Sequence, residues 1–286
     1  MREYRPHARY SHNRETSVKS AGVCDNRRVQ DLAAFEGNPD FVLSLARGLS
    51  IIEAFQDHPD GVTVGDVASR TGLSRAAVRR SLITLELLGY ASHSGSVYRL
   101  GSRVLRLGFS FLSSTSLPAL ALPVLEEVSA SIHESSSLSA LEGDEIVYLA
   151  RSAARRVMSI GLSVGSRLPA FCTSMGRVLL AALPERELRA YLKRVALRSY
   201  TPNSVRSKRV LAAEIERARR QGYALVNEEL ELGLRSLAVP VRTRSGRVVA
   251  AMNTGVHASR ATPAEMITRF LPVLQEGAER LGLALA

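Results

Sequence analysis

An ordered set of three short helices followed by a hairpin, all within residues 41–101, constrains the fold more than any other feature of the sequence. A first helix is predicted by apolar residues at three- and four-residue steps, namely Phe41, Leu45, Leu49, Ile52 and Phe55. A second helix is predicted to begin after Thr63 and to run through Arg70, because Asp66 completes a capping-box pattern with Thr63.

The third helix is expected to begin after Ser74, a good N-cap residue, and to end at Gly89. Its inward face is predicted to carry Ala77, Val78, Leu82, Leu85 and Leu88. Strand-like segments at 90–93 and 97–100 flank a Ser-Gly-Ser turn and are typical of a hairpin. Three helices and a hairpin, with Gly72 in the turn between the second and third helices, predict a winged helix-turn-helix domain.

Charge is concentrated around the third helix. Residues 70–106 hold seven arginines against Glu86, for a net charge of +6, whereas residues 41–69 carry −3 and the whole chain +11. In a helix-turn-helix the second helix of the pair enters the major groove, and arginine suits both guanine edges and phosphates. We therefore expect double-stranded DNA to contact Ser74, Arg75, Ala76, Arg79, Arg80, Arg47, Tyr98 and Arg99. RNA is not expected, because the sequence shows no aromatic stacking platform.

The remainder of the chain divides into three parts. Residues 1–40 lack helical or strand periodicity and are predicted to form a flexible arm, and residues 102–117 a linker helix. From residue 118 strands and helices alternate in mixed order, which predicts an α+β domain with a mainly antiparallel sheet over 118–286. Its first helix is expected to bury Leu122, Leu125, Val128 and Ile132. The other expected helices are 173–182, 184–195, 205–221 and one from 262 that Pro272 bends, and the expected strands are 135–142, 144–151, 156–161, 235–244 and 247–256.

Cysteine and histidine usage argues against an enzyme or a metal protein. Cys24 and Cys172 lie far apart and give no disulfide framework, which indicates a reducing, cytoplasmic compartment. Cys172 with His133 or His257 as base is the alternative of a nucleophilic site, but a structural cysteine is favoured. No metal-ligand spacing and no membrane-length apolar run occurs, so we expect no catalytic residue, metal, cofactor or membrane partner.

Several segments resemble the IclR family of bacterial transcriptional regulators over about residues 41–286. The resemblance rests on residues 44–50, 71–80, 84–90, 168–181 and 231–240. Segments 104–108, 112–114, 133–137 and 143–148 are similar to the PcaR/PcaU/PobR-type branch, whose members regulate protocatechuate and 4-hydroxybenzoate breakdown.

The resemblance implies a GAF/profilin-like effector-binding domain. It places the backbone N–H groups of Ser174, Met175 and Gly176 around an acid, with Ser236, Asn253 and Gly255 in the same pocket. Independently of the family, Thr173 opening a helix offers free amides suited to a carboxylate, although an ordinary helix N-cap is the alternative.

The function that we expect is regulation of an aromatic-acid catabolic operon by a small aromatic or dicarboxylic acid. A homodimer or homotetramer would bind a pseudopalindromic operator, with RNA polymerase as a further partner. Activation and repression are not distinguished by the residues. The alternatives are an IclR-type repressor of another carbon-source operon, responsive to glyoxylate, pyruvate or a sugar acid, a purely architectural DNA-binding protein, and a hydrolase-like domain fused to a DNA-binding module.

Overall fold

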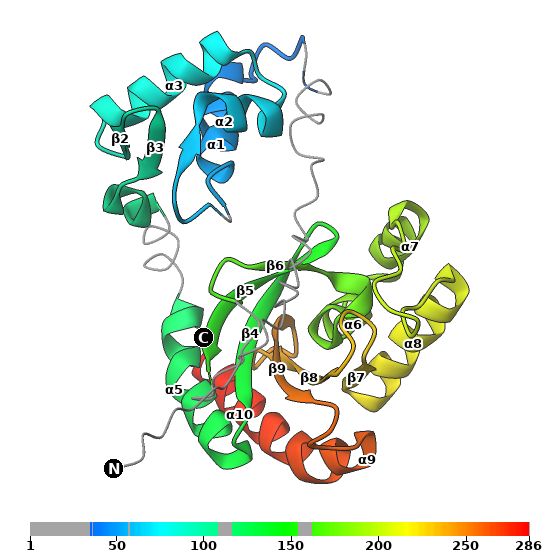
Figure 1. The fold of residues 1–286 in the computed structure, drawn as a ribbon. Helices are drawn as coiled ribbons and strands as arrows, with labels where there is room; N and C mark the ends of the chain where they lie inside the picture. The colour runs from blue at the N-terminus through cyan, green and yellow to red at the C-terminus, as the bar shows by residue number, and fades with distance from the viewer. Residues whose placement is uncertain (1–34, 36, 57, 108–115, 154–161, 286) are drawn as a thin grey trace, which may run out of the picture. The chain divides into compact units, whose positions relative to one another are not determined.

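The computed structural model describes residue 35 and residues 37–56, 58–107, 116–153 and 162–285 (Figure 1). The chain separates into two units, residues 1–106 and 107–286. Three expected segments lie wholly or partly outside the described residues. They are the arm apart from its last few residues, the strand 156–161, and the half of the linker helix at 108–115.

Between residues 43 and 100 the described part of the first unit holds three α-helices and a three-stranded antiparallel sheet of order β1-β3-β2, which confirms the winged helix-turn-helix. Thr63 and Asp66 form the predicted capping box, and Gly72 takes a left-handed conformation (φ 67°) in the turn between the second and third helices. The elements are α1 (Leu43–Glu53), β1 (Val62–Thr63), α2 (Val64–Thr71), α3 (Arg75–Leu87), β2 (Ala91–Ser94), β3 (Val97–Leu100) and a 3-10 turn (Ser102–Val104).

The core of this unit differs from the predicted one on two helices. Helix α1 buries Ile51, and the following turn buries Ala54 and Phe55, whereas Leu45 and Leu49 are 61% and 50% exposed. Helix α3 buries Val78, Leu82 and Leu85 as predicted, but Leu88, which caps its end, is 51% exposed. Only the C-terminal part of α1 packs on the other helices, so the repeat at Leu45 and Leu49 marks the helix but not its core, and the predicted inward position of Leu88 is wrong.

Arg70 fastens the end of α2 to the end of α1. Its Nη1 donates to the carbonyl oxygens of Ala54 and Gln56, each at 2.9 Å. Carbonyl groups at the C-terminus of a helix have no amide of a following turn to bond them, and here the guanidinium supplies the missing donor. One of the seven arginines counted in the basic segment therefore has a structural role.

The second unit contains a six-stranded sheet of order β6-β5-β4-β9-β8-β7, in which every neighbouring pair is antiparallel. This confirms the predicted α+β class. The strands are β4 (Ser135–Glu142), β5 (Glu145–Ser152), β6 (Arg167–Pro169), β7 (Ala224–Asn227), β8 (Leu234–Arg242) and β9 (Val248–His257). The helices are α5 (Ser116–Ile132), α6 (Ser174–Ala181), α7 (Glu185–Arg194), α8 (Lys208–Gln221), α9 (Pro263–Glu265), a π-helical turn (Met266–Phe270) that precedes Pro272, and α10 (Leu271–Ala284).

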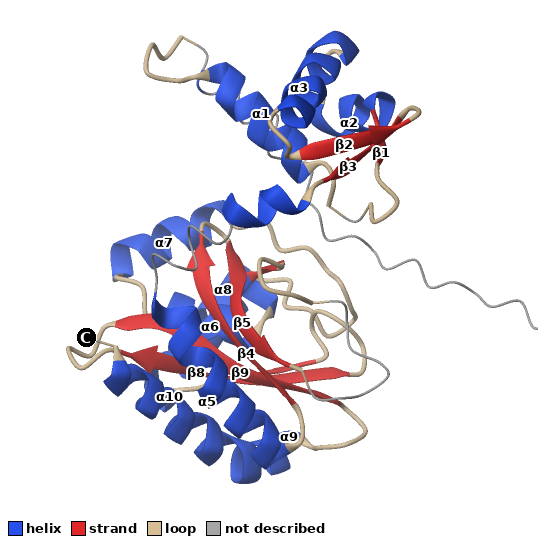
Figure 2. Cartoon of the chain, turned by 90° about the vertical axis from the view of Figure 1, so that its left-hand side faces the viewer, coloured by secondary structure: helices blue, strands red, loops and turns tan. Residues whose placement is uncertain are grey.

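Helices cover both faces of the sheet, α5 and α10 on one side and α6 and α8 on the other (Figure 2). The first interface is built on residues such as Leu125, Leu237 and Met252, and the second on residues such as Leu180 and Leu211. Leu122, predicted to lie in the core, is 43% exposed, because Leu117 and Ala121 form the inward stripe of α5 with Leu125, Val128 and Ile132. No helix among the described residues is long and apolar enough to cross a membrane.

Strands β4 and β5 are joined through a β-bulge. Ser139 pairs with Tyr148 and Ser137 with Arg151, so two residues of β4 correspond to three of β5. The register shifts between Leu138 and Ser139, which leaves an extra residue on β5.

Helix α6 is held by a buried ion pair. Arg177 Nη2 donates to Glu229 Oε2 at 2.6 Å and Arg177 Nε donates to the Phe171 carbonyl at 3.3 Å. The Arg177 side chain is 3% exposed and that of Glu229 10%. Burial raises the pKa of Glu229, although Arg177 beside it acts to lower that pKa. The Ser204 hydroxyl donates to the Glu229 carbonyl at 2.6 Å, so the backbone of the same loop is also fixed.

Removing one member of this pair should destabilise the second unit strongly. We expect Glu229→Leu to lower the free energy of unfolding by about 3–5 kcal/mol, because the buried Arg177 then loses its hydrogen-bonded partner and keeps only the longer contact with Glu214 at 3.7 Å. Calorimetric unfolding of the full chain measures this, with the exposed Glu187→Leu as control. The double variant Arg177→Leu/Glu229→Leu should recover part of the loss, and equal stability of Glu229→Leu and the wild type would contradict the assignment.

Candidate DNA interface and effector site

The N-terminal half of α3 presents a row of exposed side chains. Ser74 caps the helix, its Oγ accepting from the Ala77 amide at 3.2 Å, and Arg75, Ala76, Arg79 and Arg80 are all exposed. Within the described chain, no side chain or carbonyl group bonds the guanidinium groups of Arg75, Arg79 and Arg80. Three unneutralised guanidinium groups thus share the helix end that meets base edges in this motif.

The residues around α3 divide into exposed and buried ones. Arg47 on α1 and Arg99 on β3 are exposed, as an interface would require. Tyr98 is 9% exposed and belongs to the core of the first unit, its ring 5.4 Å from that of His93. Because neighbouring residues of a strand point to opposite faces, Arg99 faces out while Tyr98 faces in. The prediction that Tyr98 contacts DNA is corrected to a packing role.

Glu86, at the C-terminal end of α3, pairs with a histidine of the same unit. Glu86 Oε1 lies 2.6 Å from His93 Nδ1 on the hairpin. This contact ties the wing to the third helix and leaves the arginines at the other end of α3 unopposed.

The N-terminus of α6 supplies the first part of the effector site. Ser174, Met175 and Gly176 are buried, and Thr173 caps the helix, its Oγ1 accepting from the Gly176 amide at 3.2 Å. Of the three amides predicted to face an acid, that of Gly176 is therefore used by the cap. The amides of Ser174 and Met175 bond no acceptor in the described part of the chain. A Cβ at Gly176 would overlap the Ala170 backbone, so glycine here permits close packing of the helix.

The sheet supplies the floor of the site. Asn253 lies on β9 two residues from Ala251, which packs under α6 and α8, and Ser236 lies on β8 two residues from Ala238 of the same core. Ser236 pairs with Gly255 across these strands. Asn253, Gly255 and Ser236 therefore share the sheet face that α6 covers, so the structure brings together the residues predicted from the resemblance.

Two polar atoms of this site are buried without a partner. Neither Ser174 Oγ nor Asn253 Oδ1 has a hydrogen bond among the described residues, although Ser174 is 1% exposed and Asn253 8%. A buried polar atom without a partner costs about 1–3 kcal/mol, so such atoms are expected where a ligand or water completes them.

Strand β4 adds polar residues that were not predicted. Ser137 pairs with Asn253 and Ser139 with Ala251, which places both serines on the face under α6. Ser139 Oγ donates to Met175 Sδ at 3.1 Å and so connects this strand to the helix. In sequence these alternating serines resemble the solvent side of an edge strand, and only the order of the sheet places them inside.

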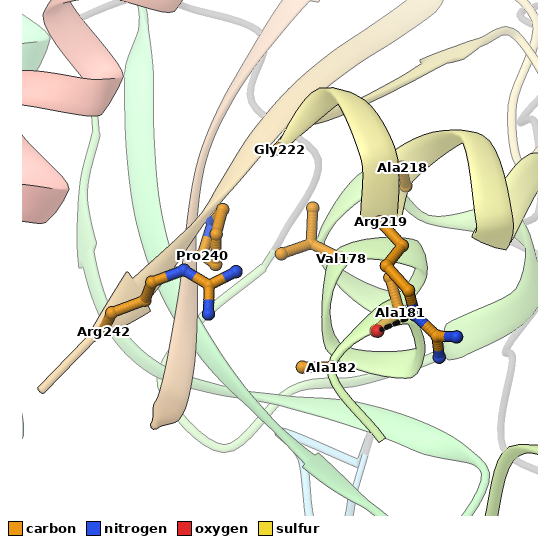
Figure 3. Close-up of a pocket in the computed structure, with 8 residues that line it drawn as sticks. All are labelled: Val178, Ala181, Ala182, Ala218, Arg219, Gly222, Pro240 and Arg242. Carbon is orange, nitrogen blue, oxygen red and sulfur yellow. Dashed lines mark hydrogen bonds between the residues drawn. The ribbon is translucent and has the colours of Figure 1, made fainter. Parts of the chain in front are cut away.

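A separate cleft opens between α6, α8 and β8 (Figure 3). Its volume is about 30 Å³, and it is lined by Val178, Ala181, Ala182, Ala218, Arg219, Gly222, Pro240 and Arg242. Ligand sites for small molecules usually measure about 300 Å³ or more. Arg219 closes one side, its Nε donating to the Ala181 carbonyl at 2.8 Å. The cleft holds about one water molecule and is too small for an effector.

Cys172 is not arranged as a nucleophile. Its side chain is fully buried, and burial raises the pKa of its thiol to about 12. Its Sγ lies 3.8 Å from the Pro169 carbonyl, and neither His133 nor His257 bonds it. No group of His, Cys, Asp and Glu in the described ranges could hold a metal ion.

A winged helix-turn-helix unit together with a sheet domain that buries unsatisfied polar groups defines a DNA-binding regulator with a small-molecule site. The chain belongs to the IclR family of bacterial transcriptional regulators. It matches the IclR helix-turn-helix domain over residues 44–95 and the bacterial transcriptional regulator IclR C-terminal domain over residues 109–282.

Relatives place the chain in the branch indicated by its sequence. It is 49% identical over 249 residues to the Pca regulon regulatory protein of Pseudomonas putida, covering 87% of this chain and 84% of that protein. It is 36% identical to the p-hydroxybenzoate hydroxylase transcriptional activator of Acinetobacter baylyi, covering 85% and 91%. The crystal structure of an IclR homolog from Microbacterium hydrocarbonoxydans complexed with 4-hydroxybenzoate is 26% identical, with a TM-score of 0.73 and coverage of 84% and 97%.

Arginine substitutions on α3 should weaken DNA binding. We expect Arg79→Ala or Arg80→Ala to cost about 1–3 kcal/mol of operator affinity where a base contact is lost, and to reduce the steep salt dependence. Fluorescence anisotropy with a promoter fragment that the wild type binds measures this. Arg247→Ala removes the same charge from an exposed turn and should bind normally. Wild-type affinity in both α3 variants would show that this face does not contact DNA.

The Cys172 thiol should resist modification in the folded protein. With a thiol pKa of about 12, almost no thiolate exists at pH 8, and burial blocks access. In a Cys24→Ser background, a disulfide reagent should label Cys172 only after denaturant is added. Rapid labelling under native conditions would revive the nucleophile interpretation.

Proposed function

We propose that this protein regulates transcription of an aromatic-acid catabolic operon of the protocatechuate, 4-hydroxybenzoate and β-ketoadipate type. A small carboxylate bound between α6 and the sheet controls its activity. The observation that carries the proposal is the pair of buried atoms without partners, Ser174 Oγ and Asn253 Oδ1, beside the free amides that open α6. The names of the Pca and p-hydroxybenzoate relatives, and the 4-hydroxybenzoate complex of the Microbacterium homolog, support the choice of ligand class.

The chemistry of the site suits a small molecule with polar ends. The N-terminus of α6 carries a partial positive charge, and the Ser174 and Met175 amides point donors at an oxygen. Asn253 Oδ1 can accept a hydrogen bond from a ligand hydroxyl, whereas the Ser174 hydroxyl can donate or accept one. Met175 and the cap formed by Thr173 give the helix end a fixed position against the sheet.

We further propose that the protein acts in the cytoplasm as a homodimer or homotetramer on a pseudopalindromic operator. The two recognition helices of a dimer would occupy half-sites one helical turn, or a multiple of it, apart. The effector controls transcription by favouring one arrangement of the DNA-binding units over another, since a ligand shifts an equilibrium only through its different affinities for the two states. RNA polymerase is the proposed partner at the promoter.

Ligand screening of the full chain tests the proposal. We expect 4-hydroxybenzoate, protocatechuate or a β-ketoadipate-type dicarboxylate to raise the melting temperature, and Asn253→Ala and Ser174→Ala to reduce that increase. Asn203→Ala changes an exposed asparagine and serves as the matched control.

A screen in which no aromatic or dicarboxylic acid stabilises the wild type would overturn the proposed ligand class. Stabilisation by glyoxylate, pyruvate or a sugar acid alone would instead assign the protein to another carbon-source operon.

A further inference from the structure

A half-buried arginine on β5 shares the sheet face of the effector site. Arg151 pairs directly with Ser137, and Ser137 pairs on its other side with Asn253. Directly opposed residues of neighbouring strands point to the same face. Arg151, Ser137 and Asn253 therefore form one row across three strands, on the side covered by α6.

The charge of Arg151 has no acidic partner in the described part of the chain. Its Nη1 donates to Ser137 Oγ at 3.2 Å, and no carboxylate lies within ion-pair distance. Burial raises the pKa of Tyr148 to about 12 although Arg151 acts to lower it, which agrees with a guanidinium near that phenol. Arg177, a fully buried arginine of the adjoining helix, is by contrast paired with Glu229.

This difference between two arginines is informative because a guanidinium loses water contacts on burial and needs a counter-charge. Arg177 finds one inside the protein. Arg151 has no counter-charge among the described residues. In the same row Asn253, which is 8% exposed, also has an Oδ1 atom without a hydrogen-bond partner. Two strand spacings separate the backbones of Arg151 and Asn253, roughly 10 Å. A small molecule that lies along this row meets a cation at one end and a hydrogen-bond acceptor at the other.

We propose that Arg151 binds a carboxylate of the effector and is the residue that makes the site select acids over neutral molecules of the same shape. Ser137 holds the guanidinium in the row, and Asn253 Oδ1 accepts a hydrogen bond from a hydroxyl at the other end of the ligand. The proposal rests on the proposed function, because it assigns the charge-bearing contact of that site. The carboxylate belongs either to an aromatic hydroxy acid or to a dicarboxylic acid, which share this chemistry.

Calorimetric titration of the full chain with acid and amide pairs tests the assignment. The probes are 4-hydroxybenzoate, its neutral isostere 4-hydroxybenzamide, and adipate as a dicarboxylate. The wild type should prefer an acid to the amide. Arg151→Met should weaken acid binding by about 10- to 100-fold while leaving amide binding nearly unchanged, because a charge-assisted hydrogen bond is lost. Arg151→Lys should recover part of the preference, and Arg247→Met is the matched control.

The acid-to-amide ratio separates recognition from folding, because a merely structural residue would change both affinities together. Arg151→Gln provides a second variant of similar polarity if Arg151→Met unfolds at lower temperature. If the wild type binds 4-hydroxybenzoate or adipate and the Arg151 variants keep its acid preference, the assignment of Arg151 is wrong and the proposed function stands. If the wild type binds none of the probes and the wider acid screen also fails, both proposals fall.

Discussion

Because helices cover both faces of its antiparallel sheet, the second unit is restricted in the side chains that its strands can carry. A strand buried on both sides has no solvent face on which to put polar residues without cost. On the side of α5 and α10 the chain largely meets this demand with aliphatic residues such as Leu237 and Met252. On the side of α6 it places serines and an asparagine in β4 and β9 instead. The polar residues on this face are the ones from which the proposed ligand site is built.

Helix α6 is anchored independently of any ligand. The Arg177–Glu229 pair fixes its outer side, and the absence of a side chain at Gly176 lets its first turn lie against the Ala170 backbone. A recognition site gains affinity when its groups are already in position before the ligand arrives. The cap at Thr173 serves the same end, because it satisfies the Gly176 amide and leaves the two amides before it without an acceptor in the described chain.

Local signals in the sequence were sufficient for much of the fold. The capping box at Thr63 and Asp66, the turn at Gly72 and the limits of β4 depend on neighbouring residues, and each was predicted correctly. The exposure of Leu45, Leu49, Leu88 and Leu122 does not follow from such local signals. A helical repeat identifies an apolar stripe but does not show whether another element covers it, and a small domain has too little interior for every leucine.

The candidate site shows the same division. The exposed arginines of α3 follow from helical spacing alone, whereas Tyr98 was misplaced because one step along a strand reverses the face. The pairing of Arg177 with Glu229, and the row that joins Arg151 to Asn253, connect residues far apart in the chain. Such contacts depend on the order of the strands, which no local pattern contains.

The bulge between β4 and β5 determines which face of the sheet Arg151 meets. In a regular strand, Tyr148 and Arg151 would point to opposite faces because they are three positions apart. The extra residue on β5 brings both to the side of α6. If the bulge closed without a change in length, the guanidinium would turn into the aliphatic layer under α5, even though every side chain remained present. Deleting one of the two residues between Tyr148 and Arg151 would instead keep both side chains on the side of α6 in a regular strand. The irregularity of the backbone, and not residue type alone, therefore sets which face receives the charge.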